Sequence, residues 1–253
     1  MLTRSVGSTP SATPCRCLSG LRWPAFLLAL ALLLPGCVST QVRTATDTGG
    51  QPIGIDGSVV LVEPDIELSE VLAGGAREPR QAWTEAARRF YPQAAREVLQ
   101  AQGIAVRPDF NLPPDAGPDH RLRQLYLLNQ AVSMSILQHA RSGSRLRNKH
   151  GRFDWTLGPG VADLRAATGA DYALFTYLRD SYSSSGRVAM RIIGFVLLGG
   201  DVGGGTQVGL ASLVDLRTGQ VVWHNLLLDQ TGDVRDLAGA RETAGDLLKG
   251  IRR

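Results

Sequence analysis

Cysteine and lysine are scarce in this chain of 253 residues. Three cysteines stand at positions 15, 17 and 37, and only Lys149 and Lys249 are lysines among 27 basic side chains. So few thiols in a chain of this length exclude a small disulfide scaffold and a cysteine-rich zinc module. Apolar residues make up 43% and charged residues 20% of the chain, which excludes a disordered polyampholyte and predicts a packed core.

A long hydrophobic run is also missing. The longest one, residues 25–34, follows a segment that contains three arginines and no acidic residue. At about 1.5 Å per residue, a helix of this length covers roughly half of a ~30 Å hydrocarbon core. A basic start before a short apolar segment predicts that residues 1–36 are a secretory signal peptide rather than a membrane span.

The end of this segment reads Leu34-Pro-Gly-Cys37. It resembles the lipobox of bacterial lipoproteins, in which the cysteine is acylated and becomes the first residue of the mature chain. The resemblance implies that Cys37 is a lipid anchor to the membrane. Val38, in place of aspartate after the cysteine, implies sorting to the outer membrane, with the domain on its periplasmic face.

Cleavage before Cys37 changes the charge balance. It removes three arginines and no acids, which leaves 24 basic and 23 acidic residues and a net charge of +1. Bulk charge therefore gives no reason to expect a nucleic-acid partner. With lipid on Cys37, the mature chain has no thiol for nucleophilic or metal chemistry.

Residues 37–56 are rich in Thr, Ser and Gly and predict a flexible linker after the lipidated cysteine. If extended at ~3.3 Å per residue, this linker would hold the domain about 60 Å from the membrane. Residues 57–253 then form a single periplasmic domain, which is long enough to bury one core.

The domain alternates between strand and helix patterns, separated by an acidic loop at 65–78. A Thr-Gly pair at 218–219 predicts a hairpin between the last two strands. These patterns favour an α/β (α+β) domain with a mixed sheet of five to six strands and three to four helices. Strands are expected at 58–63, 104–107, 172–178, 187–198, 207–216 and 221–228, and helices at 80–102, 115–140, 160–168 and 231–251.

Two phrases in the C-terminal third resemble a known group of envelope proteins. They are Thr168-Gly-Ala-Asp-Tyr-Ala-Leu-Phe175 and Ala211-Ser-Leu-Val-Asp-Leu-Arg-Thr-Gly-Gln-Val-Val-Trp223. The group includes the curli secretion channel subunit, the lipoprotein activators of penicillin-binding proteins and the amino-terminal domain of the Tol-Pal propeller protein. The resemblance implies a small α/β domain at the envelope without catalytic residues. Residues 194–206 have no counterpart in it.

Motifs for catalysis, metals and cofactors are lacking. The four histidines have no metal-ligand spacing, and no Gly-x-Ser-x-Gly elbow occurs. The glycine-rich segment 199–206 lacks the Gly-Lys-Ser/Thr of a phosphate loop. Glu63, Asp65 and Glu67 invite a paired-carboxylate reading, but the neighbouring Pro64 favours an acidic, solvated rim. We therefore expect no enzyme, no cofactor and no metal.

The sharpest charge feature of the mature chain is a basic cluster at 141–152, followed by Phe153-Asp-Trp155. Arginine forks bind phosphate and carboxylate in bidentate fashion, and an adjacent aromatic ring adds a stacking face. We expect Arg145, Arg147, Arg152 and Trp155 to contact a partner, although a solvated loop is the plainer alternative.

Two functions remain. The leading one is a lipid-anchored, non-catalytic binding or assembly accessory that contacts an envelope protein or peptidoglycan, with self-association left open. The alternative is an oligomeric secretion or export channel component in which 187–216 inserts as a β-hairpin, each arm having about the 9–11 residues of a membrane strand.

Overall fold

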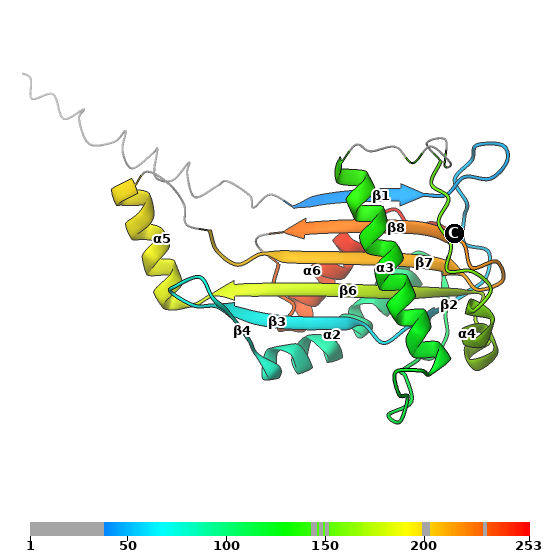
Figure 1. Cartoon of the computed structure of the whole chain (residues 1–253), viewed down its shortest axis with the longest axis horizontal. Coiled ribbons are helices and arrows are strands. Elements are labelled where there is room, and N and C mark those ends of the chain that lie inside the picture. The colour runs from blue at the N-terminus through cyan, green and yellow to red at the C-terminus, as the bar shows by residue number, and fades with distance from the viewer. Residues whose placement is uncertain (1–37, 143–145, 147–148, 150–151, 199–202, 230–231) are drawn as a thin grey trace, which may run out of the picture. The chain divides into compact units, whose positions relative to one another are not determined.

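The computed structural model describes residues 38–253, apart from 143–145, 147–148, 150–151, 199–202 and 230–231. The chain divides into two compact units, Met1–Gly36 and Cys37–Arg253. The second unit is described below. Its described residues form five helices and a mixed sheet of eight strands (Figure 1), so the expected α/β class is confirmed, with more strands than predicted.

The longest strand, β6 (Tyr172–Ser183), has twelve residues and lies in the middle of the sheet, where it pairs with three other strands. Its first half pairs in parallel with β2 (Ser58–Leu61), and its second half pairs in parallel with β3 (Asp65–Val71). On its other side the order continues antiparallel through β7, β8 and β1. The remaining strands are β1 (Ser39–Thr44), β4 (Arg77–Pro79), β5 (Ala105–Val106), β7 (Gln207–Asp215) and β8 (Val221–Asp229).

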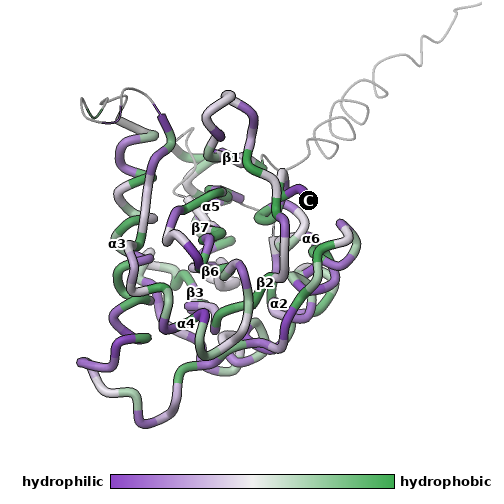
Figure 2. Tube along the Cα trace, turned by 90° about the vertical axis from the view of Figure 1, so that its right-hand side faces the viewer, coloured by the Kyte–Doolittle hydropathy of each residue, from purple (hydrophilic) through white to green (hydrophobic). Residues whose placement is uncertain are grey.

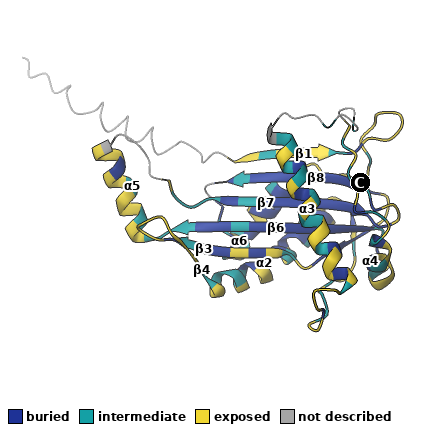
Figure 3. Cartoon of the chain, viewed as in Figure 1, coloured by how far each residue is buried: buried dark blue, intermediate teal, exposed yellow. Residues whose placement is uncertain are grey.

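Helices cover both faces of this sheet, as Figures 1 and 2 show from two directions. On one face lie α2 (Gln81–Ala101) and α6 (Leu237–Leu247), which enclose a core with Tyr91, Leu178 and Leu213. On the other lie α3 (Arg121–Ser142) and α4 (Val161–Thr168), over a second core with Leu164 and Phe175. The central strands are therefore buried on both sides, as Figure 3 shows.

Pro92 lies inside α2 without ending it, and the expected helix is confirmed over nearly its full range. The stripe that the helix buries, Ala87, Tyr91, Ala94 and Leu99, has spacings of three to five residues. This packing compensates for the loss of the backbone hydrogen bond that proline cannot donate.

The segment expected to be a flexible linker is partly folded. Residues Ser39–Thr44 form β1, which pairs with β8 from Ser39↔Leu228 to Thr44↔Trp223. Ala45 and Ile55 are buried. The composition is that of an edge strand, and its partner lies about 180 residues later in the chain, so no local pattern indicated the pairing.

The prediction of an acidic loop at 65–78 was also wrong. It contains β3 and β4 joined by a turn with Gly75 at φ +89°. Ile66 and Leu68 enter the core, while Asp65 lies at the surface and its carboxylate pairs with Arg179 at 2.9 Å. An alternating strand with acidic residues on its outer face resembles a loop in composition.

The third correction concerns the hairpin proposed for 187–216. Residues Ser185–Leu198 form a helix, α5, and β7 is the one strand among the described residues of that range. The hydroxyl of Ser184 accepts a hydrogen bond from the backbone N–H of Arg187 (3.1 Å) and caps the helix. A continuous apolar run does not distinguish a strand from a helix, and the channel alternative loses the hairpin on which it depended.

Candidate functional site

The structure describes only part of the predicted contact set. Cys37, Arg145 and Arg147 lie outside the described residues, while Arg152 is exposed and Trp155 is half-buried. The Lys149 ammonium lies 4.6 Å from the centre of the Trp155 ring. The centre of the His139 ring, on α3, lies 5.9 Å from the centre of the same Trp155 ring. Trp155 also packs against the core under α3 and α4, so much of its ring is already occupied by the chain's own side chains.

The end of the sheet where α5 is attached brings distant parts of the chain together. Ser39 pairs with Leu228, Asp229 pairs with Gln207, and Gln207 pairs with Asp180 near the end of β6. The start of β1 therefore lies at the same end as the start of α5, as Figure 1 shows at the left of the sheet. With strands about 4.8 Å apart, three spacings separate β1 from β6 by roughly 15 Å.

The helix α5 turns its polar side toward the rest of the domain. Arg187 donates through Nε to the carbonyl of Gly203 (2.9 Å) and through Nη1 to that of Ala73 (3.3 Å). One turn later, Arg191 lies so close to Gly204 that a Cβ there would stand 2.4 Å from Nη1. Gly194, on the same side of the helix, is buried.

The apolar side chains of α5 point away from the domain, so Figure 3 shows the helix largely in the colour of exposed residues. At about 100° per residue they cover an arc of roughly 220°. The three at the far end, Phe195, Val196 and Leu197, are 68%, 72% and 73% exposed. The other exposed members are Val188, Met190, Ile192 and Ile193. Exposed apolar surface of this extent is typical of an interaction site.

Beneath this end of the sheet is a buried polar cluster. The hydroxyl of Tyr182 and the amide of Gln207 (2.8 Å) both donate to Asp180 Oδ2. Burial raises the pKa of Asp180 to about 6 despite these donors. The same cause raises the pKa of Tyr182 above its ordinary value.

A cation sits beside this cluster. Arg235 lies 3.8 Å from the centre of the Tyr182 ring and 4.9 Å from that of Trp83. Its hydrogen bond to Asp233 (2.9 Å) lowers the pKa of that carboxyl and raises the pKa of the guanidinium. The cluster holds the loop before α6 against the strand ends, and every contact in it is made within the chain.

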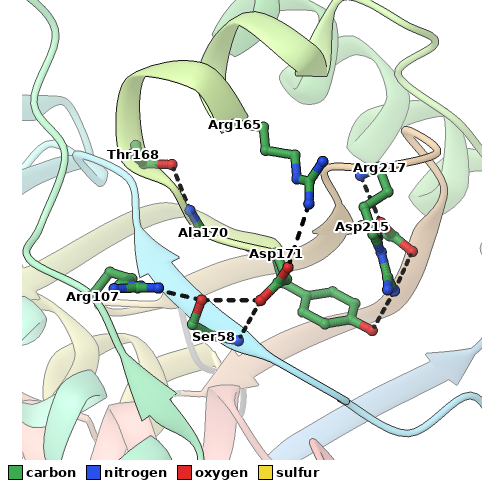
Figure 4. Close-up of polar contacts among 9 residues, drawn as sticks. Ser58, Arg107, Arg165, Thr168, Ala170, Asp171, Asp215 and Arg217 are labelled. Carbon is green, nitrogen blue, oxygen red and sulfur yellow. Dashed lines mark hydrogen bonds and ion pairs between the residues drawn. The ribbon is translucent and has the colours of Figure 1, made fainter.

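The opposite end of the sheet is organised by Asp171, which lies in the phrase used for the family resemblance (Figure 4). Its Oδ2 accepts hydrogen bonds from the backbone N–H (3.0 Å) and hydroxyl (3.1 Å) of Ser58. The backbone bond is the main reason that the pKa of Asp171 is lowered, and Arg165 adds an ion pair at 3.8 Å. A Cβ at Gly57 would stand 2.5 Å from Oδ2, so the close approach requires glycine. The geometry joins β2 to β6 and is structural.

An open cleft of about 580 Å³ lies between α2 and the strand β2. Its charged walls include Glu63, Arg88 and Arg96. Arg88 donates to the carbonyl of Ile66 (3.2 Å), and Arg96 pairs with Asp109. Both of these arginines are therefore already engaged with the fold.

Two further features are missing from the part of the chain that is described. No group of three or more histidine, cysteine, aspartate or glutamate side chains there is placed to hold a metal ion. None of the helices in the same residues is both long and apolar enough to cross a bilayer. The feature that sequence reasoning missed is the outward apolar face of α5, for which Ser184 as a helix cap was the available signal.

Comparison with known proteins adds no family. No family model matches the chain, and no curated protein matches it. Among solved structures, a PelC dodecamer from Paraburkholderia phytofirmans is similar with a TM-score of 0.42 and 13% identity, over 86% of this chain and 99% of that one. A point variant of the same dodecamer gives a TM-score of 0.38 and 14% identity, over 86% and 100%. At these scores the likeness does not extend to function.

Proposed function

We propose that this chain is a lipid-anchored protein of the outer membrane, facing the periplasm, that acts as a non-catalytic binding or assembly accessory in the cell envelope. The basic and apolar leader, the Leu34-Pro-Gly-Cys37 phrase and Val38 support the anchor and its sorting. The exposed apolar face of α5 and the exposed Arg152 of the basic cluster support a role in binding.

The observation that carries the proposal is where the fold begins. Ser39, two residues after Cys37, is already paired with Leu228 in the sheet. Consecutive Cα atoms are 3.8 Å apart, so lipid on Cys37 would hold this end of the sheet within roughly 8 Å of the lipidated residue. The anchored domain would rest against the bilayer rather than stand about 60 Å away from it.

The anchor is tested by replacing Cys37 with serine. We expect the wild-type chain to incorporate an alkyne-tagged palmitate in growing cells and to sediment with outer membranes. The Cys37→Ser chain should incorporate none and should leave the membrane fraction, because serine has no sulfur to form the thioether that carries the lipid, and several acyl chains at this residue are the source of stable attachment. Cys17→Ser is the matched control, since it changes a thiol in the leader. Palmitate retained on the Cys37→Ser chain would refute the anchor.

The binding role is tested at the basic cluster. We expect Arg145→Ala, Arg147→Ala and Arg152→Ala together to reduce photo-crosslinks from position 154 to an envelope partner by at least about tenfold, because paired charges at an interface are costly to truncate. Peptidoglycan and a second copy of the chain are distinguished by muramidase digestion and by mass. Arg43→Ala, an exposed arginine on β1, is the control. Equal crosslinking by all variants would contradict contact at these arginines.

A further inference from the structure

We infer that α5 is a second membrane contact, lying in the headgroup and acyl boundary of the same bilayer leaflet that holds the lipid on Cys37. The inference rests on the proposed anchor and deepens it. The first observation is that α5 turns its polar side toward the domain and its apolar side toward the outside. Its arginine side is hydrogen-bonded to the carbonyls of Ala73 and Gly203, and its apolar arc faces outward.

The second observation is the position of the anchor relative to this helix. The register from β1 through β8 and β7 to β6 places Ser39 and the start of α5 at one end of the sheet. A lipid attached at Cys37 would therefore bring α5 to the bilayer at no further cost in chain ordering, which gives the helix a high effective concentration at the surface.

Two other exposed apolar residues lie at this end of the sheet. Val38, next to the anchor, is 41% exposed. Leu72 directly follows β3, whose last residue pairs with Ser183 at the end of β6, and it is 36% exposed. With α5 they form an apolar rim on the side of the domain that the anchor would hold to the membrane. Since charged side chains are absent from the outward arc, insertion depends on apolar burial rather than on attraction to anionic lipid.

The length of α5 agrees with an interfacial position. Its 14 residues span about 21 Å as a helix, less than the ~30 Å hydrocarbon core. An apolar helix lying in the interface is buried about 5–10 Å deep. A second copy of this chain is the competing occupant, and the experiment below separates the two.

The scarcity of cysteine supplies a sharp test. In the lipidated protein without its leader, the sulfur of Cys37 would be held in a thioether, so a cysteine introduced at Phe195 would be the one reactive thiol for a nitroxide label. The protein is reconstituted into vesicles of phosphatidylethanolamine and phosphatidylglycerol. Collision of the label with lipid-soluble oxygen and with a water-soluble nickel chelate is then measured. Leu127→Cys, at a 52% exposed position on α3, is the control, and Val196→Cys repeats the measurement one residue along.

We expect the ratio of oxygen to nickel accessibility at positions 195 and 196 to exceed that at 127 by at least about tenfold, with little change in high salt. A label at 195 that meets nickel as freely as the one at 127 overturns the inference. A label at 195 that is shielded from both reagents also overturns the inference. If its spectrum shows spin–spin broadening that vanishes on dilution with unlabelled protein, the helix contacts a second copy of the chain. Without such broadening, the label is buried within the protein, and the inference fails equally.

The failure of the proposed anchor has a different signature. An unmodified Cys37 would take the nitroxide in the wild-type chain, which has no other cysteine once the leader is removed. A wild-type chain that resists labelling, combined with a water-exposed label at 195, leaves the anchor intact and refutes the role of α5 alone.

Discussion

Replacing Asp180 by asparagine and replacing His224 by leucine will change the pH dependence of the unfolding free energy in opposite directions. Asp180 lies in the buried cluster at the end of β6 and is 4% exposed, and burial raises its pKa to about 6. The unfolded carboxyl titrates near 3.9. Between about pH 4 and 6 the folded state therefore holds more protons, and this carboxyl lowers the stability as the pH rises through that window.

His224 acts in the other direction. It lies in β8, is 2% exposed, and its buried Nε2 has no hydrogen-bond partner among the described residues. Burial lowers its pKa to about 4, against roughly 6.5 in the unfolded chain. The unfolded state holds more protons between these values, so this imidazole lowers the stability as the pH falls from about 6.5 to 4.

In the wild-type chain the two effects oppose each other between about pH 4 and 6. A difference of roughly 2 in pKa corresponds to about 3 kcal/mol for each group. Relative to wild type, Asp180→Asn should gain up to that amount of unfolding free energy as the pH rises from 4 to 7. His224→Leu should gain a similar amount as the pH falls from 7 to 4.

Urea unfolding of the detergent-solubilised protein, followed by tryptophan fluorescence at several pH values, measures both differences. Because the two effects have opposite signs, the unfolding free energy of the double variant should differ from that of wild type by an amount that changes little with pH. Asp154→Asn, at an exposed position, should run parallel to wild type throughout. A parallel curve for either buried variant would contradict the assigned direction of its pKa.

Local sequence patterns predicted the interior of this fold better than its edges. The helix α2 and the hairpin strands β7 and β8 were found because each carries its own periodicity or turn residue, such as Gly219 at φ +76°. The strands β1 and β3 were missed because β1 is a polar edge strand and β3 carries acidic residues on its outer face, so neither shows an apolar run like that of β2, whose partner β6 is equally distant in the chain. Pairing of that range leaves no mark on the local composition.

The candidate site divides in the same way. The lipobox-like phrase ending in Cys37, on which the proposed anchor rests, is a local signal that can be read without the fold. The orientation of α5 is set by hydrogen bonds from Arg187 to Ala73, 114 residues earlier in the chain, and to Gly203 in the glycine-rich segment that follows the helix. The apolar run itself is visible in the sequence, but the side of it that faces outward follows from those bonds.

The largest effect of a single methyl group is expected at Gly239, in the first turn of α6. A Cβ there would stand 1.7 Å from the carbonyl oxygen of Asp233 and 2.6 Å from its carbonyl carbon. These are backbone atoms of the loop that carries Arg235, so a change of rotamer cannot relieve the clash. The backbone N–H of Gly239 also donates to Asp236 Oδ1 (2.9 Å), which caps the helix.

The chain offers a matched control in the same helix. Gly245 is exposed, and nothing lies within 4 Å of the position its Cβ would take. Alanine is favoured over glycine in a helix interior by roughly 1 kcal/mol, so Gly245→Ala should raise the free energy of unfolding by up to about that amount. Gly239→Ala gains the same propensity but must displace the 233–236 loop.

Gly239→Ala should therefore lower the unfolding free energy by about 3 kcal/mol, the upper range for overpacking a core, while Gly245→Ala raises it. Both are measured by urea unfolding at neutral pH. Since Tyr182 accepts a hydrogen bond from the N–H of Val234 in the displaced loop (3.0 Å), Gly239→Ala should also perturb the fluorescence of Trp83, which stacks edge-on with Tyr182 at 5.6 Å. A Gly239→Ala variant as stable as wild type, or more stable, would show that α6 tolerates the added methyl group and that the 233–236 loop does not hold the helix start as tightly as the geometry requires.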